Sequence, residues 1–222
     1  MKMNLTTLLG GLACGLALGL STASASIITI GSGTLNTTVP DGNAAGIIST
    51  INVNVSSWAN SMNSLTLTLN ITGGNDGDLY AYLRYNGTTV VLLNRPGLAG
   101  DPAGIGYTTP GYNNVTLSGG SYANINTTQN PVTGGTYNPS AGSTAFASYN
   151  GVNPNGNWTL FISDLSGGDV SFSQLESWSL TFNAVPEPVN VALGVFGAVL
   201  LGVAGLRRAR GYFKVSSHNK AA

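Results

Sequence analysis

The feature that most constrains the fold is a strict alternation of apolar and polar residues in short stretches. In the clearest stretch, Leu65, Leu67, Leu69 and Ile71 are separated by single polar residues. Successive side chains of a β-strand point to opposite faces, so this pattern predicts a strand with one buried and one solvated face. Alternation or β-branched composition predicts further strands at residues 47–55, 79–85, 88–93, 112–117, 157–163 and 174–182.

Turn signals separate these strands. Asn86-Gly87 joins two of them, and this pair favours a tight hairpin because both residues tolerate a positive φ. No helical periodicity occurs in residues 26–184, while residues 94–148 are loop-rich and call for a functional reason or for short hidden strands. The pattern predicts an all-β fold, an antiparallel β-sandwich or jelly roll, flanked by an N-terminal signal peptide and one short C-terminal hydrophobic helix.

The N-terminal residues have the three parts of a secretory signal peptide. Lys2 supplies a positive charge, residues 8–20 are apolar, and Ala23-Ser24-Ala25 is a small-residue cleavage site. We therefore expect residues 1–25 to be removed by signal peptidase between Ala25 and Ser26, and the protein to be exported.

The C-terminal residues also have three parts. A proline-containing segment comes first, then an uncharged apolar run to Leu206, then three arginines. Prolines cannot extend the preceding strand, the run is shorter than the ~20 residues of a typical membrane span, and arginines stay on the cytoplasmic side. An ordinary C-terminal anchor would need only the last two parts. The residues concerned are Val185, Pro186, Glu187, Pro188, Arg207, Arg208 and Arg210.

In this order, the three parts resemble the PEP-CTERM sorting signal of exopolysaccharide-producing Gram-negative bacteria, over residues 185–210. The resemblance implies that an exosortase cuts near the Pro-Glu-Pro. It also implies that the chain crosses the membrane only transiently, from Val189 to Leu206, with residues 211–222 as a cytoplasmic tail. An inner-membrane intermediate would then give a protein at the cell surface, at the outer membrane or outside the cell.

The segment between the two signals, residues 26–184, has the length of one domain. It contains two basic residues, Arg84 and Arg95, against seven acidic ones, which gives a net charge of −5. Nucleic acids and anionic membrane surfaces are therefore unfavourable partners, whereas divalent cations are favourable ones. The acidic residues are Asp41, Asp76, Asp78, Asp101, Asp164, Asp169 and Glu176.

Two blocks of this segment carry a second resemblance. Residues 155–160 read Asn-Gly-Asn-Trp-Thr-Leu, with Asp164 and the closing strand 175–182 after them, and Gly77-Asp78-Leu79 opens an earlier strand. These blocks resemble the P (Homo B) domain of proprotein convertases and bacterial subtilisin-like proteases, over residues 47–182. The resemblance implies a β-sandwich. Alternation places Trp158 and Trp178 in its core.

The exported segment lacks the residues of common hydrolases. It contains no His and no Cys, because His218 lies in the tail and Cys14 in the signal peptide. Neither a Ser-His-Asp triad nor a Cys-His pair can form, and zinc would lack its usual ligands. We expect no enzymatic activity. A hydrolase that uses two carboxylates is the remaining catalytic hypothesis.

The acids are better interpreted as calcium ligands, because Ca²⁺ binds carboxylate and loop carbonyl oxygens in flexible geometry. Asp76 and Asp78 lie in one glycine-rich loop, and Asp164 and Asp169 flank Ser166-Gly167-Gly168 in another. The P-domain family includes calcium-binding members, so the resemblance also implies calcium. In the alternative interpretation, Asp78 and Asp164 accept hydrogen bonds from nearby backbone N–H groups as Asx turns.

Tyr80 and Tyr82 alternate with the apolar residues of their strand and are candidates for contact with a glycan; alternatively, they cover a second sheet. We therefore expect a non-catalytic cell-surface or extracellular-matrix protein, linked to exopolysaccharide or biofilm. The alternative is an accessory domain that stabilises or targets a subtilisin-like serine protease in trans.

Overall fold

The computed structural model describes residues 26–55, 59–128, 134–186, 194 and 196–208. The chain divides into a β unit, Ala25–Val185, and a second unit to which the C-terminal helical residues belong. Helical residues are found at 194 and 196–208. Within the described part of the chain, no helix combines the length and apolarity needed to cross a bilayer. The expected crossing from Val189 to Leu206 extends over residues outside the described ranges.

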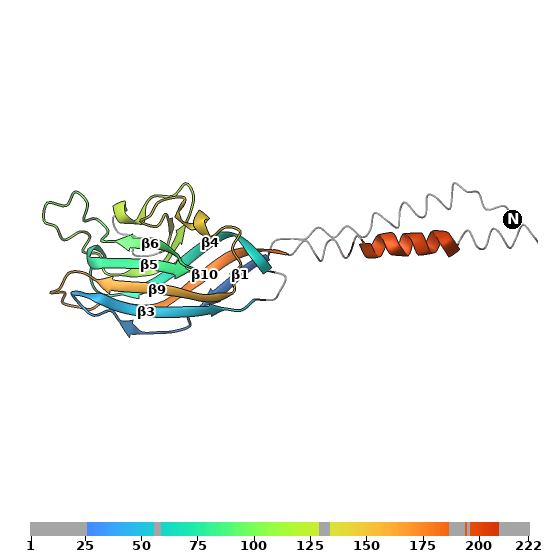
Figure 1. Cartoon of the computed structure of the whole chain (residues 1–222). Coiled ribbons are helices and arrows are strands. Elements are labelled where there is room, and N and C mark those ends of the chain that lie inside the picture. Colours follow the sequence, from blue (N-terminus) through green and yellow to red (C-terminus); the bar gives the residue numbers. More distant parts are fainter. Residues whose placement is uncertain (1–25, 56–58, 129–133, 187–193, 195, 209–222) are drawn as a thin grey trace, which may run out of the picture. The chain divides into compact units, whose positions relative to one another are not determined.

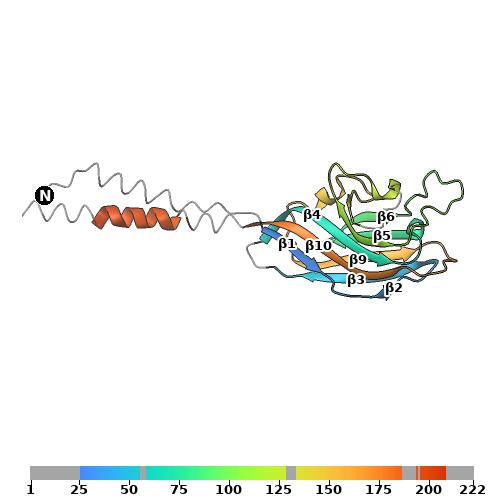
Figure 2. The ribbon, with the colours of Figure 1, turned by 180° about the vertical axis from the view of Figure 1, so that it is seen from behind.

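The β unit is a sandwich of two sheets, which confirms the predicted fold class (Figure 1). One sheet has the order β1-β10-β4-β7-β8, and β2 pairs with β10 as well. Its strands are β1 (Ser26–Gly31), β2 (Thr37–Thr38), β4 (Ala59–Thr72), β7 (Tyr112–Ser118), β8 (Thr136–Tyr137) and β10 (Gln174–Pro186). Seen from behind, β1, β10 and β4 of this sheet lie in front (Figure 2).

The second sheet has the order β3-β9-β5-β6. It consists of β3 (Asn43–Val53), β5 (Leu79–Tyr85), β6 (Thr88–Asn94) and β9 (Gly156–Asp164). The predicted hairpin joins β5 to β6, with positive φ at Asn86 and Gly87. Three 3-10 turns complete the described β unit: η2 (Asp76–Asp78), η3 (Ile125–Thr127) and η4 (Ala145–Tyr149).

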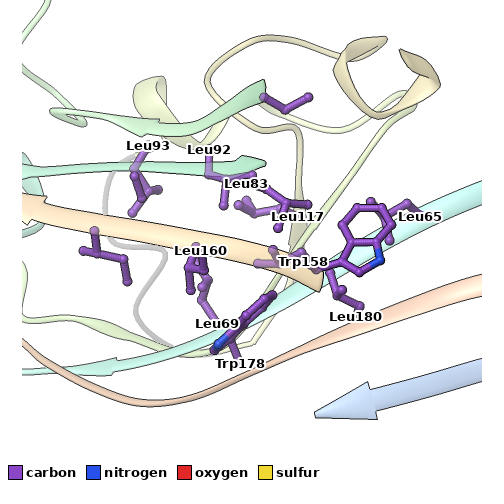
Figure 3. Close-up of a cluster of buried hydrophobic side chains, with 14 of the residues drawn as sticks. Leu65, Leu69, Leu83, Leu92, Leu93, Leu117, Trp158, Leu160, Trp178 and Leu180 are labelled. Carbon is purple, nitrogen blue, oxygen red and sulfur yellow. The ribbon is translucent and has the colours of Figure 1, made fainter. Parts of the chain in front are cut away.

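The core lies between the sheets and is formed largely by the alternate apolar residues of the predicted strands (Figure 3). Val39, Ile125, Phe146 and Tyr149, from segments not predicted as strands, also belong to it. Both predicted core tryptophans are buried. The Trp158 Nε1–H donates to the Pro154 carbonyl at 2.9 Å, and the Trp178 Nε1–H donates to the Ser49 hydroxyl at 2.8 Å. Tyr85 stacks on Trp158 with ring centroids 3.9 Å apart. The indole rings of Trp158 and Trp178 are therefore buried with their N–H groups paired.

The β unit has two distinct ends. β1 begins and β10 closes at one end, where Ser26 pairs with Ala184. The opposite end carries the loop from β9 to β10, the turn between β2 and β3, and η2 after β4. Figure 1 shows these loops at the left of the sandwich, away from the end of β10. Acidic side chains gather at this loop end.

Candidate metal centre

Three carboxylates from separate segments meet at the loop end. Asp41 lies in the turn between β2 and β3, Asp164 ends β9, and Asp169 lies in the loop between β9 and β10. One oxygen of each lies within 4.8 Å of the corresponding oxygens of the other two. We call this set the carboxylate cluster.

Backbone N–H groups hold one oxygen of each carboxylate. Asp41 Oδ2 accepts from the Gly168 N–H at 2.9 Å, and Asp164 Oδ1 accepts from the Ser166 N–H at 3.1 Å. Asp169 Oδ2 accepts from the Asn75 N–H at 3.1 Å. These bonds orient the carboxylates. The turn interpretation holds for Asp164, whose donor is two residues away, whereas Asp41 and Asp169 accept from segments distant in the sequence. These hydrogen bonds do not satisfy every carboxylate oxygen of the cluster.

Two oxygens of the cluster are buried without a partner among the described residues. They are Asp41 Oδ1 and Asp164 Oδ2, and Asp164 as a whole is only 1% exposed. A buried carboxylate oxygen without a donor costs free energy unless a proton or a cation satisfies it. This observation separates the cluster from an ordinary group of surface acids.

Burial and mutual repulsion both act on the carboxylates of the cluster. Burial raises the pKa of Asp164, and the charges of Asp78, Asp169 and Asp41 raise it further. Burial also raises the pKa of Asp169, the charges of Asp78 and Asp41 raise it further, and the Asn75 N–H offsets part of this rise. A bound divalent cation would reverse this effect, because it stabilises the ionised form of every ligand.

The donor set fits calcium. Ca²⁺ takes six to eight oxygen ligands at flexible geometry, from carboxylates, backbone carbonyls and water. All three cluster residues supply carboxylate oxygens, and all three are on loops or strand ends, where backbone carbonyls are also accessible. The ion would join the β2–β3 turn to the end of β9 and the β9–β10 loop, which follow more than a hundred residues later in the sequence.

Asp78 lies beside the cluster and is bound to other residues. Asn75 Nδ2–H donates to Asp78 Oδ2 at 3.3 Å and also donates to Asp169 Oδ1. Arg95 Nη2 lies 3.5 Å from Asp78 Oδ1 as an ion pair. Asp78 therefore contributes negative charge to the site, while Arg95 fixes its orientation.

Asp76 points away from this arrangement. It is fully buried where η2 packs against the segment before β7, and its N–H donates to the Thr109 carbonyl at 3.0 Å. Neither carboxylate oxygen has a hydrogen-bond partner of good geometry among the described residues. Burial raises the pKa of Asp76 to about 8, and the Gly111 N–H offsets part of this rise. Its charge in turn helps burial raise the pKa of Tyr112.

The glycines around η2 are required by close approach. Gly74 has a φ of +62°, and a side chain there would overlap Ser173. Gly77 lies against the backbone of residues 105–107, where an added Cβ would overlap the Ile105 carbonyl. These two positions let the chain bring Asp76 to one side of η2 and Asn75 to the other.

The sequence prediction and the structure overlap in part. Of the four predicted ligands, Asp164 and Asp169 come together in the cluster, Asp78 lies next to it, and Asp76 is in a separate buried position. Asp41 was missed. It stands in a Pro-Asp-Gly turn, a common turn sequence, and only its register against the β9–β10 loop shows its role.

The outer face of the β3-β9-β5-β6 sheet carries a second feature. Strand register aligns Ile48, Phe161, Tyr82 and Val91 in one row across the four strands. The rings of Tyr82 and Phe161 stack with centroids 4.8 Å apart and an interplanar angle of 15°, and Tyr80 meets both edge-on. No described segment crosses in front of this sheet in Figure 1. We call this row together with Tyr80 the aromatic row; its members are Ile48, Tyr80, Tyr82, Val91 and Phe161.

Polar residues flank the aromatic row. The next register row towards the hairpin contains Thr50, Thr159, Arg84 and Thr89, and the Arg84 side chain is exposed. The two tyrosines singled out from the sequence are therefore on the outer face of a sheet, half-buried against each other and Phe161. The sequence pattern also placed Phe161 on a strand, but only the strand pairing of the structure shows that it lies beside Ile48 and Tyr82.

A shallow cavity of about 440 Å³ lies on the other sheet. Glu176 is the single acid among the described residues that line it, and its carboxylate accepts a hydrogen bond from the Thr72 hydroxyl at 2.8 Å. Glycoside hydrolysis normally uses two carboxyl groups on either side of the scissile bond. The residues of this cavity do not supply such a pair.

Comparison with known proteins gives no family. No family model matches the chain, and no curated protein matches it. A solved structure of an Aeromonas sobria serine protease with its chaperone is 13% identical over 79% of this chain and 30% of that chain, with a TM-score of 0.43. The A. sobria serine protease alone gives 13% identity over 78% of this chain and 29% of that one, with a TM-score of 0.40. The chain thus spans less than a third of the length of either structure.

Proposed function

We propose that the mature protein is an exported, non-catalytic β-sandwich module that binds calcium at its loop end and is displayed at the cell surface. The observation that carries this proposal is the carboxylate cluster with its buried, unpartnered oxygens. A cation held there would tie three loops together in an exported domain that has no disulfide to do so. The P-domain resemblance in its sequence supports the same interpretation.

The route to the surface is part of the proposal. Signal peptidase would cut after Ala25, and an exosortase would cut near Pro186-Glu187-Pro188. Ala25, Glu187, Pro188 and Arg210 lie outside the described residues. The order of the proline segment, apolar run and arginines supports the second cut.

Intact mass and cell fractionation of the native protein test this route. We expect a mature form that begins at Ser26 and ends near the Pro-Glu-Pro, without the apolar run. A variant with Pro186 and Pro188 both changed to Ala is expected to keep the apolar run and stay in the inner-membrane fraction. A native protein that retains the arginines would contradict the sorting proposal.

The aromatic row is the proposed contact with exopolysaccharide. The faces of aromatic rings attract the partly positive C–H groups of a sugar ring, and the flanking hydroxyl and guanidinium groups can hydrogen-bond to its oxygens. The row is wide enough to cross four strands and is uncovered. It is therefore suited to an extended chain and less to a small ligand in a closed pocket.

Affinity electrophoresis in gels that contain a neutral glucan or alginate tests this contact. Tyr82→Leu keeps an apolar side chain on the sheet and removes the ring. We expect it to weaken binding roughly two- to tenfold, because one ring contact contributes roughly 0.5–1.5 kcal/mol beyond its buried area. Tyr122→Leu, an exposed tyrosine outside the row, is the matched control. Equal retardation of both variants and the unmodified protein would contradict a role for the row.

A further inference from the structure

The loop between β9 and β10, residues 165–173, exposes an unusual amount of apolar surface. Seven large apolar side chains are exposed in the described β unit, and three of them, Leu165, Val170 and Phe172, lie in this loop. Val170 is fully exposed and Phe172 is 59% exposed. Soluble domains rarely gather exposed apolar side chains in this way without an interaction that covers them.

The same loop supplies Asp169 of the carboxylate cluster and follows directly on Asp164, another member. Asp164 precedes Leu165, and Asp169 immediately precedes Val170. A hollow of about 210 Å³ lies beside them and is lined by Gly74, Asn75 and residues 168–171. A cation at the cluster and the apolar side chains therefore belong to one continuous surface segment.

The position of this loop favours docking on an extended surface. It lies at the end of the sandwich opposite to the entry of β1 and the exit of β10 (Figure 1). Docking through this end would leave the N-terminal and C-terminal ends of the β unit free of the contact. It would also leave the aromatic row, which is on a sheet face, accessible.

The charge of the loop end determines which kind of surface it can bind. Without a cation, the carboxylate cluster and the adjacent Asp78 place four carboxylates against Arg95, and this charge repels an anionic surface. Bound Ca²⁺ would neutralise part of this charge. The cluster fills only some of the six to eight positions of a calcium ion, so phosphate oxygens of a lipid headgroup can complete the shell. Val170 and Phe172 would then enter the boundary between headgroups and acyl chains.

We propose that this end of the sandwich is a calcium-dependent docking site for a lipid surface rich in anionic phospholipid headgroups, whose phosphate carries an uncompensated negative charge. The proposal rests on the calcium site of the proposed function and adds its partner. Such a contact would hold the mature protein at a membrane after the C-terminal segment is removed. The net negative charge of the domain opposes docking without the metal, and so makes docking on an anionic surface depend on calcium.

Co-sedimentation with vesicles tests the proposal. The processed native protein is mixed with vesicles of phosphatidylcholine alone, or of equimolar phosphatidylcholine and phosphatidylglycerol, in calcium or in EGTA. We expect sedimentation only with phosphatidylglycerol and calcium, reversed by EGTA. The double variant Val170→Ser, Phe172→Ser should bind these vesicles at least about tenfold more weakly, because two apolar side chains no longer leave water. Ile27→Ser, which changes an exposed residue of β1, is the matched control.

Calcium calorimetry without vesicles separates the two proposals. If the protein binds calcium but does not sediment, or if the double variant sediments as well as the Ile27→Ser control, lipid docking is wrong and the calcium site stands. If calorimetry detects no calcium binding to the unmodified protein or to the double variant, the calcium site itself is wrong. Binding of soluble glycerol phosphate is measured as well. If the double variant and the unmodified protein bind it equally and also bind vesicles equally, the site recognises phosphate alone and lipid docking is wrong.

Discussion

Asp76→Asn is expected to raise the free energy of unfolding at pH 8 by on the order of 5 kcal/mol in EGTA. Burial holds the folded-state pKa of Asp76 at about 8, far above its ordinary value of 3.8. The folded protein therefore keeps a proton that the unfolded chain releases above about pH 4, and stability falls as pH rises through this window. Asparagine has no proton to lose, so the variant should lose this pH dependence.

Urea unfolding at pH 5 and pH 8 measures the effect. The variant and the unmodified protein should be close in stability near pH 4 and diverge steadily towards pH 8. Asp101→Asn is the contrasting control, because N–H donors of Ala103, Gly106 and Ile105 lower the pKa of Asp101. Its loss should reduce stability above about pH 4, the opposite sign. Parallel pH profiles for Asp76→Asn and the unmodified protein would contradict the buried neutral acid.

Saturating calcium is expected to raise the melting temperature by roughly 5–10 °C over the value in EGTA. Ligand at a hundredfold excess over its Kd stabilises the folded state by about 2.7 kcal/mol. For a domain of this size, each 1 kcal/mol corresponds to roughly 2–4 °C. The physical reason is that the ion binds only when the three segments of the carboxylate cluster are together.

Asp164→Asn should reverse the order of stability between the two conditions. In EGTA the variant should melt at or above the temperature of the unmodified protein, because a buried charge with a raised pKa has been removed. In calcium it should melt below it, because a ligand has been lost. Glu176→Gln removes one carboxylate outside the cluster and keeps the acceptor for the Thr72 hydroxyl, so it should respond to calcium normally. A calcium shift of the same size in all three proteins would argue against the cluster.

The parts of the fold that depend on local pattern could be predicted from the sequence. Period-two alternation located β4, β5, β9 and β10, and the Asn86-Gly87 pair located the hairpin. The two core tryptophans were placed by the same rule. In each case the signal is contained in a few neighbouring residues, and long-range packing agrees with it.

The parts that depend on pairing between distant segments could not be predicted. β1, β2 and β8 are short strands at the edges or ends of the larger sheet, and they exist because a partner strand is in register. Asp41 joins Asp164 and Asp169 only through the pairing of the β2–β3 turn with a loop more than a hundred residues later. Asp76 and Asp78 are two residues apart in sequence. Only the backbone path through η2 shows that Asp76 is buried away from the cluster while Asp78 lies beside it.

Calorimetric titration of the processed native protein with calcium is the most direct test of the central claim, a calcium site at the carboxylate cluster. We expect saturable binding of one ion, weakened as pH falls through the raised pKa values of Asp164 and Asp169, because both ligands must lose their protons. Asp164→Asn should bind at least about tenfold more weakly, while Glu176→Gln should bind like the unmodified protein. No saturable binding to the unmodified protein, or equal binding by Asp164→Asn, would contradict the claim.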